Sequence, residues 1–145
     1  MSALQEGPYP GAAAGVDQIA DLANAYYTAA LVLLRSAETE APLSMAPARL
    51  CAMHAIELYL NAFLRHQGVP AAQVRARMHN LADPAAFAAL GFRRRTEMHL
   101  STMSERREYL ISRYAPEQIR QHTEINRLQA TLVEVMTKVG KHLRR

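Results

Sequence analysis

The sequence predicts an all-α protein, an up-and-down bundle of four or five helices. Half of the 145 residues are hydrophobic. Alanine and leucine, which favour helices, are abundant, whereas runs of β-branched residues are rare. Apolar residues recur every three or four positions in several segments, as on one face of an α-helix. No segment alternates like a strand, and short connections between long helices favour an antiparallel bundle.

Two long amphipathic helices are expected in the first half of the chain. The first begins near Val16, where Asp17 can cap free backbone amides. It ends by Pro42, because a helix interior excludes proline. The second begins around residues 44–47 and stops at Gly68, a residue that tolerates the left-handed turn after a helix.

Three further helices are expected in the second half. A short helix spans about residues 84–90, before Gly91, and a longer one spans about residues 96–113. Pro116 suits the first turn of the last helix. The apolar stripe of that helix continues to Leu143.

The chain length corresponds to one domain, which we place at residues 16–145. Residues 1–15 are rich in glycine and proline and predict a flexible N-terminal arm. The arm lacks the basic start and apolar stretch of a signal peptide. No apolar run approaches the ~20 residues of a membrane span. We therefore expect a soluble, cytoplasmic protein that does not enter a membrane.

Charge is distributed unevenly along the chain. Residues 1–72 hold three arginines against six acidic residues, and residues 73–145 hold fourteen basic residues against seven acidic ones. The basic second half favours an acidic partner such as RNA, a nucleotide or an acidic protein. A solvated basic surface is the alternative. Cys51 is the single cysteine, and we expect it to be a small buried side chain, not a nucleophile.

Two opposite charges fall on apolar helix stripes that should face the core. Glu57 lies in the stripe of the second long helix, and His54 and Asn61 share its edge. Arg107 lies in the stripe of the helix expected at 96–113. Since an unpaired buried carboxylate is costly and arginine can bind it with two N–H groups, we predict a Glu57–Arg107 ion pair, with Arg113 as the reserve partner. The pair would fix helix register or line a cleft that binds a phosphate or a base.

Metal binding is not expected. His54 and Glu57 have a spacing that can present two ligands on one helical face, but a di-metal bundle needs matching sets on other helices. The sequence holds no second set at a matching position, so we predict neither a metal nor another cofactor. His79, just before the short third helix, either packs the connection or contacts a ligand.

Three segments carry a resemblance to a known family. Residues 55–64, Ala-Ile-Glu-Leu-Tyr-Leu-Asn-Ala-Phe-Leu, with Gly68 behind them, resemble the second helix of HEPN domains, which typically reads Ala-x-Glu-x-x-Leu-Lys-Ala before a glycine turn. Residues 79–81, His-Asn-Leu, resemble the family's His-Asp-Leu. Residues 107–114, followed by Pro116, resemble the late Arg-Tyr-Pro segment of some members.

The resemblance covers about residues 17–140 and implies a helical bundle that is often a homodimer. It also implies association with RNA, nucleotides or a nucleotidyltransferase partner. Many members are metal-independent ribonucleases with Arg-x4–6-His on the later helix, where histidine moves a proton and arginine stabilises phosphorane charge. Counting from Arg107, the six-residue reach ends at Arg113 without meeting a histidine. Arg94 and His99 have the spacing but straddle the expected helix start.

The favoured interpretation is therefore a HEPN-like module that is not an enzyme. Arg107, Arg113 and His79 would meet a phosphate-bearing ligand, and Tyr114 would be available for stacking. Two alternatives stay open. One is an active ribonuclease that uses Arg94 and His99 across a dimer interface. The other is a structural or protein-interaction bundle in which the predicted ion pair only fixes register.

Overall fold

The computed structural model describes residues 9–37 and 40–144, and all regular structure in these ranges is helical. The prediction of an all-α bundle is confirmed. The long helices are α1 (Val16–Ser36), α2 (Ala46–His66) and α7 (Ile125–Leu143). The shorter ones are α3 (Ala71–Ala76), α4 (Pro84–Leu90), α5 (Arg94–Glu105) and α6 (Glu108–Tyr114), and 3-10 turns span Pro42–Met45 and Pro116–Gln121.

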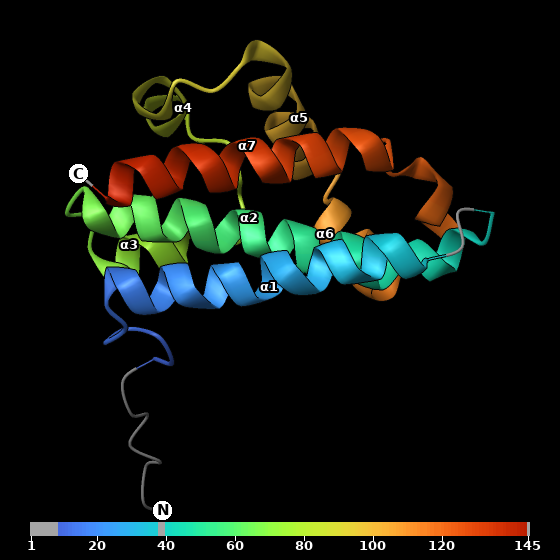
Figure 1. Ribbon diagram of the computed structural model, residues 1–145, viewed down its shortest axis with the longest axis horizontal. Coiled ribbons are helices and arrows are strands. Elements are labelled where there is room, and N and C mark those ends of the chain that lie inside the picture. The colour runs from blue at the N-terminus through green and yellow to red at the C-terminus, as the bar shows by residue number, and fades with distance from the viewer. Residues whose placement is uncertain (1–8, 38–39, 145) are drawn as a thin grey trace, which may run out of the picture.

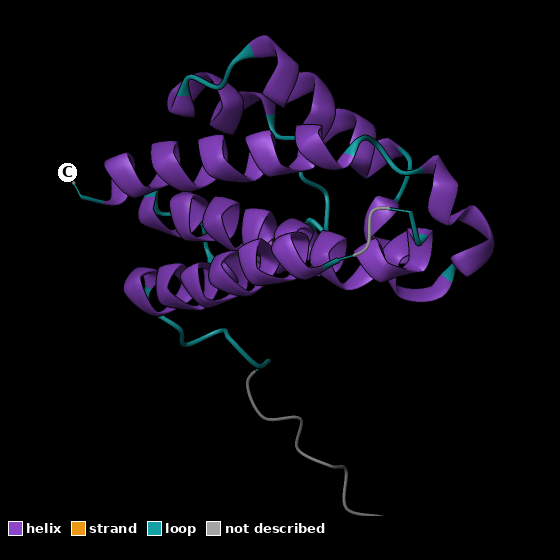
Figure 2. Ribbon diagram, turned by 45° about the vertical axis from the view of Figure 1, so that its right-hand side comes forward, coloured by secondary structure: helices purple, strands orange, loops and turns teal. Residues whose placement is uncertain are grey.

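The three long helices lie side by side with α2 in the middle (Figure 1). By the colour bar, α2 and α7 run in one direction and α1 in the other. The segment that connects the end of α2 to the start of α7 includes the shorter helices α4, α5 and α6. Figure 2 shows the same order from a second angle, with α7 between α2 and the segment formed by α4 and α5. The bundle is therefore up-and-down, and its third segment, between α2 and α7, is divided into several short helices.

Helix α2 supplies the centre of the core. Its buried side chains include Ile56, Leu60 and Phe63, and burying each contributes roughly 1.5–3 kcal/mol. Helix α1 faces it with the fully buried alanines Ala23 and Ala30, which allow close approach. Helix α7 covers the other side of α2 with a stripe spaced as the sequence predicts: Leu128, Leu132, Val135 and Val139. None of the helices in the described ranges is long and apolar enough to cross a membrane.

Several helix ends lie where the sequence predicts them. Gly68 and Gly91 adopt left-handed φ values of 90° and 67° just after α2 and α4, which a glycine does without steric cost. Helix α1 begins at Val16. Gln18, not Asp17, accepts the hydrogen bond from the Gly15 N–H, at 2.8 Å. Residues 1–8 of the expected flexible arm lie outside the described residues.

The single helix predicted at 96–113 is wrong, because the structure has two helices there. Helix α5 ends at Glu105 and α6 begins at Glu108. Between them Arg107 adopts left-handed angles, φ 52° and ψ 46°. The break shifts the register by one residue, so Glu108 is fully buried and Arg107 is exposed. No glycine or proline marks this break in the sequence.

The start of the last helix also differs from the prediction. Pro116 opens a 3-10 turn, and α7 begins at Ile125. Side chains hold the connection between them. The His122 Nδ1–H donates to the Ile119 carbonyl at 2.8 Å, and the Ser112 hydroxyl donates to His122 Nε2 at 2.9 Å. These side-chain hydrogen bonds hold a connection where sequence periodicity alone suggests a continuous helix.

Replacing Arg107 by glycine is expected to raise the free energy of unfolding by about 1 kcal/mol, because glycine adopts the left-handed conformation without the penalty of a Cβ. The midpoint of urea unfolding measures the change. Arg106→Gly is the matched control. It should lower stability by roughly 0.5–1 kcal/mol, since Arg106 has right-handed angles. A loss of stability in Arg107→Gly would instead show that the arginine side chain itself holds the fold together.

Candidate functional site

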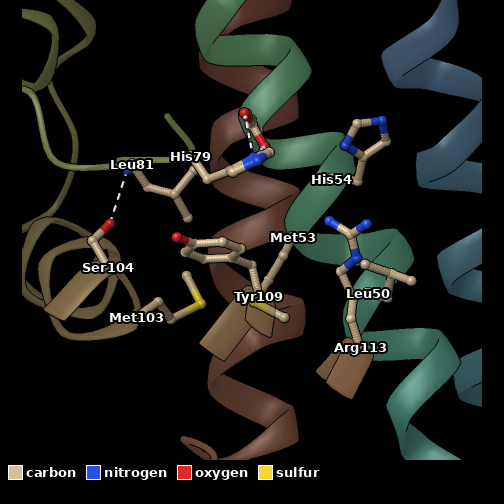
Figure 3. A pocket seen from close by; sticks show the side chains of 10 residues that line it. Leu50, Met53, His54, His79, Leu81, Met103, Ser104, Tyr109 and Arg113 are labelled. Carbon is tan, nitrogen blue, oxygen red and sulfur yellow. Dashed lines mark hydrogen bonds and ion pairs between the residues drawn. The ribbon is translucent and has the colours of Figure 1, made fainter. Parts of the chain in front are cut away.

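A small cavity opens between α2, α5, α6 and the connection that follows α3 (Figure 3). Its volume is about 80 Å³. A cavity needs only roughly 10–15 Å³ to hold one water, so this one has room for a small polar group. The lining side chains are Leu50, Met53, His54, Glu57, His79, Leu81, Met103, Ser104, Tyr109 and Arg113.

A hydrogen bond between Glu57 and His79 forms one wall of this cavity. His79 Nδ1 lies 2.9 and 3.0 Å from the two carboxylate oxygens of Glu57. The imidazole also packs on the Tyr109 ring, with centroids 4.8 Å apart. Met78 and His79 both have left-handed φ values, 49° and 67°. Such backbone strain persists only where contacts enforce it, and the carboxylate and the aromatic ring supply those contacts.

His54 and Arg113 lie on another side of the same cavity. The His54 ring packs edge-on against Tyr26, with centroids 4.5 Å apart. Burial lowers the pKa of His54, and His79 and Arg113 lower it further against the opposing effect of Glu57. His54 is therefore neutral near pH 7. Figure 3 shows the guanidinium of Arg113 directed toward His54, which makes Arg113 the permanent cation of the cavity.

A larger groove lies on the other side of the Glu57–His79 pair. Its volume is about 680 Å³, within the range of about 300–1,000 Å³ typical of ligand pockets. Residues from 9–14, α1, α2 and α3 line it, and Asn61 is among them. The Arg75 guanidinium lies over the Tyr9 ring at 4.3 Å. His54, Glu57 and His79 belong to both the cavity and the groove, so the ion pair separates the two spaces.

The structure brings together five of the residues selected from sequence and leaves Arg94, His99, Arg107 and Tyr114 outside both spaces. His54, Glu57 and His79 line both spaces, Arg113 lines the cavity and Asn61 lines the groove.

The predicted Glu57–Arg107 ion pair is wrong. Within the part of the chain that the structure describes, Glu57 pairs with His79 and forms no ion pair with Arg107. Arg107 is exposed at the break before α6. Tyr114 is 67% exposed and has the Arg113 guanidinium 5.0 Å from its ring centre.

Sequence reasoning missed a buried polar network centred on Glu108. Glu108 accepts hydrogen bonds from the Thr123 N–H at 2.8 Å and from the Thr123 hydroxyl at 3.0 Å. Because a carboxylate only accepts, the hydroxyl must in turn accept from the His99 Nε2–H, at 2.8 Å. His99 Nδ1 then accepts from the Thr131 hydroxyl at 2.7 Å. Arg49 donates to the Thr123 carbonyl at 2.7 Å, which completes the network.

This network removes the predicted catalytic pair. His99 is 5% exposed, so its expected position at a dimer surface is wrong. Burial, with the nearby charges of Arg127 and Arg49, lowers the pKa of His99 to about 4. Arg94 is exposed at the start of α5. A substrate that reaches Arg94 therefore does not reach the imidazole of His99.

Two cavity residues also escaped sequence reasoning. The Ser104 hydroxyl accepts the Leu81 N–H at 2.8 Å and so holds the connection against α5. Tyr109 enters the cavity only because α6 restarts after the break, and its hydroxyl points toward Ser104 in Figure 3.

Cys51 is half-buried, and burial raises the pKa of its thiol, which disfavours the reactive thiolate. No cluster of three or more potential metal ligands occurs within the described ranges.

Searches against models of known protein families, curated proteins and solved structures found no match to this chain. The geometry of the cavity and groove is therefore the basis on which a function is assigned.

Proposed function

We propose that this protein is a HEPN-like, non-catalytic module that binds a nucleotide-type phosphate ligand where the cavity meets the groove. One observation carries the proposal. Arg113, His54 and His79, from three separate segments, surround a cavity of about 80 Å³, and the groove beside it has a volume typical of ligand sites. The family resemblance of these same segments supports the same class of ligand.

The donors around the cavity suit a phosphate group. Arg113 offers a planar fork of N–H groups that matches phosphate oxygens. Tyr109 and Ser104 each carry a hydroxyl hydrogen that can donate. The carboxylate of Glu57 would repel an anion if it were alone. It instead has a hydrogen-bond partner in His79 Nδ1, at 2.9 Å.

Replacing Arg113 by glutamine is expected to weaken binding of AMP or inorganic phosphate at least about tenfold, since a hydrogen bond to a charged group contributes about 1.5–3 kcal/mol. Isothermal titration calorimetry at low salt measures the change. Arg107→Gln is the matched control, because it removes an equal charge from an exposed position six residues away. Absence of saturable phosphate or AMP binding by the unaltered protein, or an equal loss in Arg107→Gln, would refute the proposal.

A metal-independent ribonuclease is the second candidate, and the cavity favours it for one reason. Two histidines and an arginine meet there, and a neutral His54 has the protonation state that a general base needs. Incubation of the protein with RNA in the presence of a chelator tests this. Cleavage that is lost in His54→Ala and retained in His99→Gln would favour the enzyme over the binding module.

We further propose a homodimer that acts beside a nucleotidyltransferase-type partner, as the resemblance implies. Large apolar side chains exposed on α1 and α5, Leu22, Val32 and Met98, support an interface between copies or with another protein. Sedimentation velocity distinguishes the dimer from a monomer. A monomer at micromolar concentration would leave only the ligand-binding part of the proposal.

A further inference from the structure

A second groove, separate from the cavity, runs along the outer face of α7 beside the junction of α4 and α5. Its volume is about 650 Å³. Four cations line it, Arg93, Arg127, Lys138 and Lys141, and we call this surface the basic groove. The side-chain amides of Asn126 and Gln129 add neutral donors. None of these residues lines the cavity between α2, α5 and α6.

The charge of Glu134, the carboxylate within the basic groove, is already compensated. It accepts hydrogen bonds from the Arg93 backbone N–H at 2.7 Å, the Thr96 hydroxyl at 2.8 Å and the Lys138 ammonium at 3.0 Å. Burial alone would raise the pKa of Glu134, but these three hydrogen bonds lower it overall. Glu134 therefore neutralises Lys138 and leaves the other three cations to set the charge of the groove.

One polar atom of Arg127 lacks a hydrogen bond in the described part of the chain. Its Nε atom is buried and has no hydrogen-bond partner within the described part of the chain. A buried donor without a partner is unfavourable.

The spacing of the cations excludes a single phosphate as the natural ligand. Arg127 and Lys141, which Glu134 does not neutralise, are fourteen residues apart, which is about four helical turns, so they share one face of α7 about 21 Å apart along the axis. Arg93 lines the same groove from the α4–α5 junction. An extended polyanion reaches all of these charges, whereas one phosphate group reaches only one or two.

The lining favours nucleic acid over an acidic protein. Protein interfaces are anchored by aromatic or large apolar side chains. The basic groove offers only Ala130 and Val133, of which Val133 is 40% exposed. Interfaces with nucleic acid are polar and strongly positive. The groove also holds no aromatic ring on which a base could stack, so its contacts are with the backbone.

We infer that the basic groove binds the sugar–phosphate backbone of a nucleic-acid strand without reading its sequence. This inference rests on the proposed function for its class of ligand and extends it from one phosphate to a strand. The cavity and the basic groove lie on different surfaces and share no lining residue. Variants can therefore test each site separately.

The test measures RNA affinity as a function of salt for the full chain. Fluorescence anisotropy with a labelled RNA of about 20 nucleotides gives the slope of log K against log salt, to which each phosphate neutralised on a single strand contributes about 0.7. The variant R93Q/R127Q/K141Q should lose about 2 from this slope. The variant R35Q/R106Q/R120Q removes the same charge from exposed arginines elsewhere and should keep a slope close to that of the unaltered protein.

The outcomes separate the groove from the cavity. Loss of RNA affinity in R93Q/R127Q/K141Q with unchanged AMP binding supports the inference. Equal losses in both triple variants, a strong preference among RNA sequences, or equal binding of poly-glutamate of matched length would overturn it. AMP binding without RNA binding would overturn the groove and leave the cavity. RNA binding that depends on the groove, with no AMP binding, would overturn only the cavity.

Discussion

Replacing Glu108 by alanine is expected to lower the free energy of unfolding by about 3–5 kcal/mol, the usual cost of breaking a buried charged interaction by removing one partner. The Glu108 side chain is fully buried. Its loss leaves the Thr123 N–H and hydroxyl without their acceptor. It also leaves the half-buried Arg49 without the negative charge that stabilises its protonated form. Each of these orphaned groups adds a desolvation cost that the alanine cannot offset.

Urea unfolding followed by circular dichroism measures this change at pH 7.5. Glu105→Ala is the matched control, because Glu105 lies three residues earlier and is exposed. It should change stability by less than about 0.5 kcal/mol. A change in Glu108→Ala as small as that of the control would show that the network contributes nothing to stability.

The same substitution should also weaken ligand binding in the cavity. Glu108 is the first residue of α6, and the next turns of that helix carry Tyr109 and Arg113 into the cavity. Glu108 is thus a positioning residue, one that acts on a ligand through other side chains. In conditions where Glu108→Ala stays folded, we expect weaker phosphate binding than in Glu105→Ala.

The long helices could be predicted because local chemistry and burial agree along them. In α7 the apolar spacing predicts the buried stripe from Leu128 to Val139. At Gly68 and Gly91 a glycine is needed for the left-handed turn that the structure shows. A helix end can be predicted from the sequence where the position needs a special backbone conformation and holds a residue type that permits it.

The site could be predicted only in part, because two of its determinants are non-local. Glu57 was correctly expected to have a partner, but its partner is His79, in a connection whose course has no periodic signal. The helix break at Arg107 occurs in a residue that does not favour the left-handed region. Contacts between Glu108 and Thr123, fifteen residues away, supply the compensating energy. Neither effect can be read from the local sequence, so Arg107 was placed inside and Glu108 was overlooked.

His99 makes the stability of the protein depend on pH. In the neutral ring, Nε2–H donates to Thr123 and Nδ1 accepts from Thr131. A proton on Nδ1 would require the Thr131 hydroxyl to turn and accept instead of donating. Burial, with Arg127 and Arg49 nearby, lowers the pKa to about 4 in the folded state, against about 6.5 in the unfolded chain.

The direction of the effect follows from which state binds the proton. Above about pH 7.5 the ring is neutral in both states, so His99 gives no pH dependence. Between about pH 6.5 and 4, His99 binds a proton in the unfolded chain but not in the folded protein. The free energy of unfolding therefore falls as pH falls. The slope is about 1.4 kcal/mol per pH unit, and the total loss by pH 4 is about 3 kcal/mol. Urea midpoints measured from pH 7.5 to pH 4 follow this decline.

Substitutions separate His99 from the other groups that titrate in this window. His99→Gln should be less stable than the unaltered protein at pH 7.5, because glutamine reaches only one of the two threonines with good geometry. Its stability should nevertheless fall less steeply toward pH 4.5, by about one proton in the slope. His54, whose pKa burial also lowers, should contribute a smaller share that His54→Gln removes. A His99→Gln profile as steep as that of the unaltered protein would show that His99 does not cause the loss of stability at low pH.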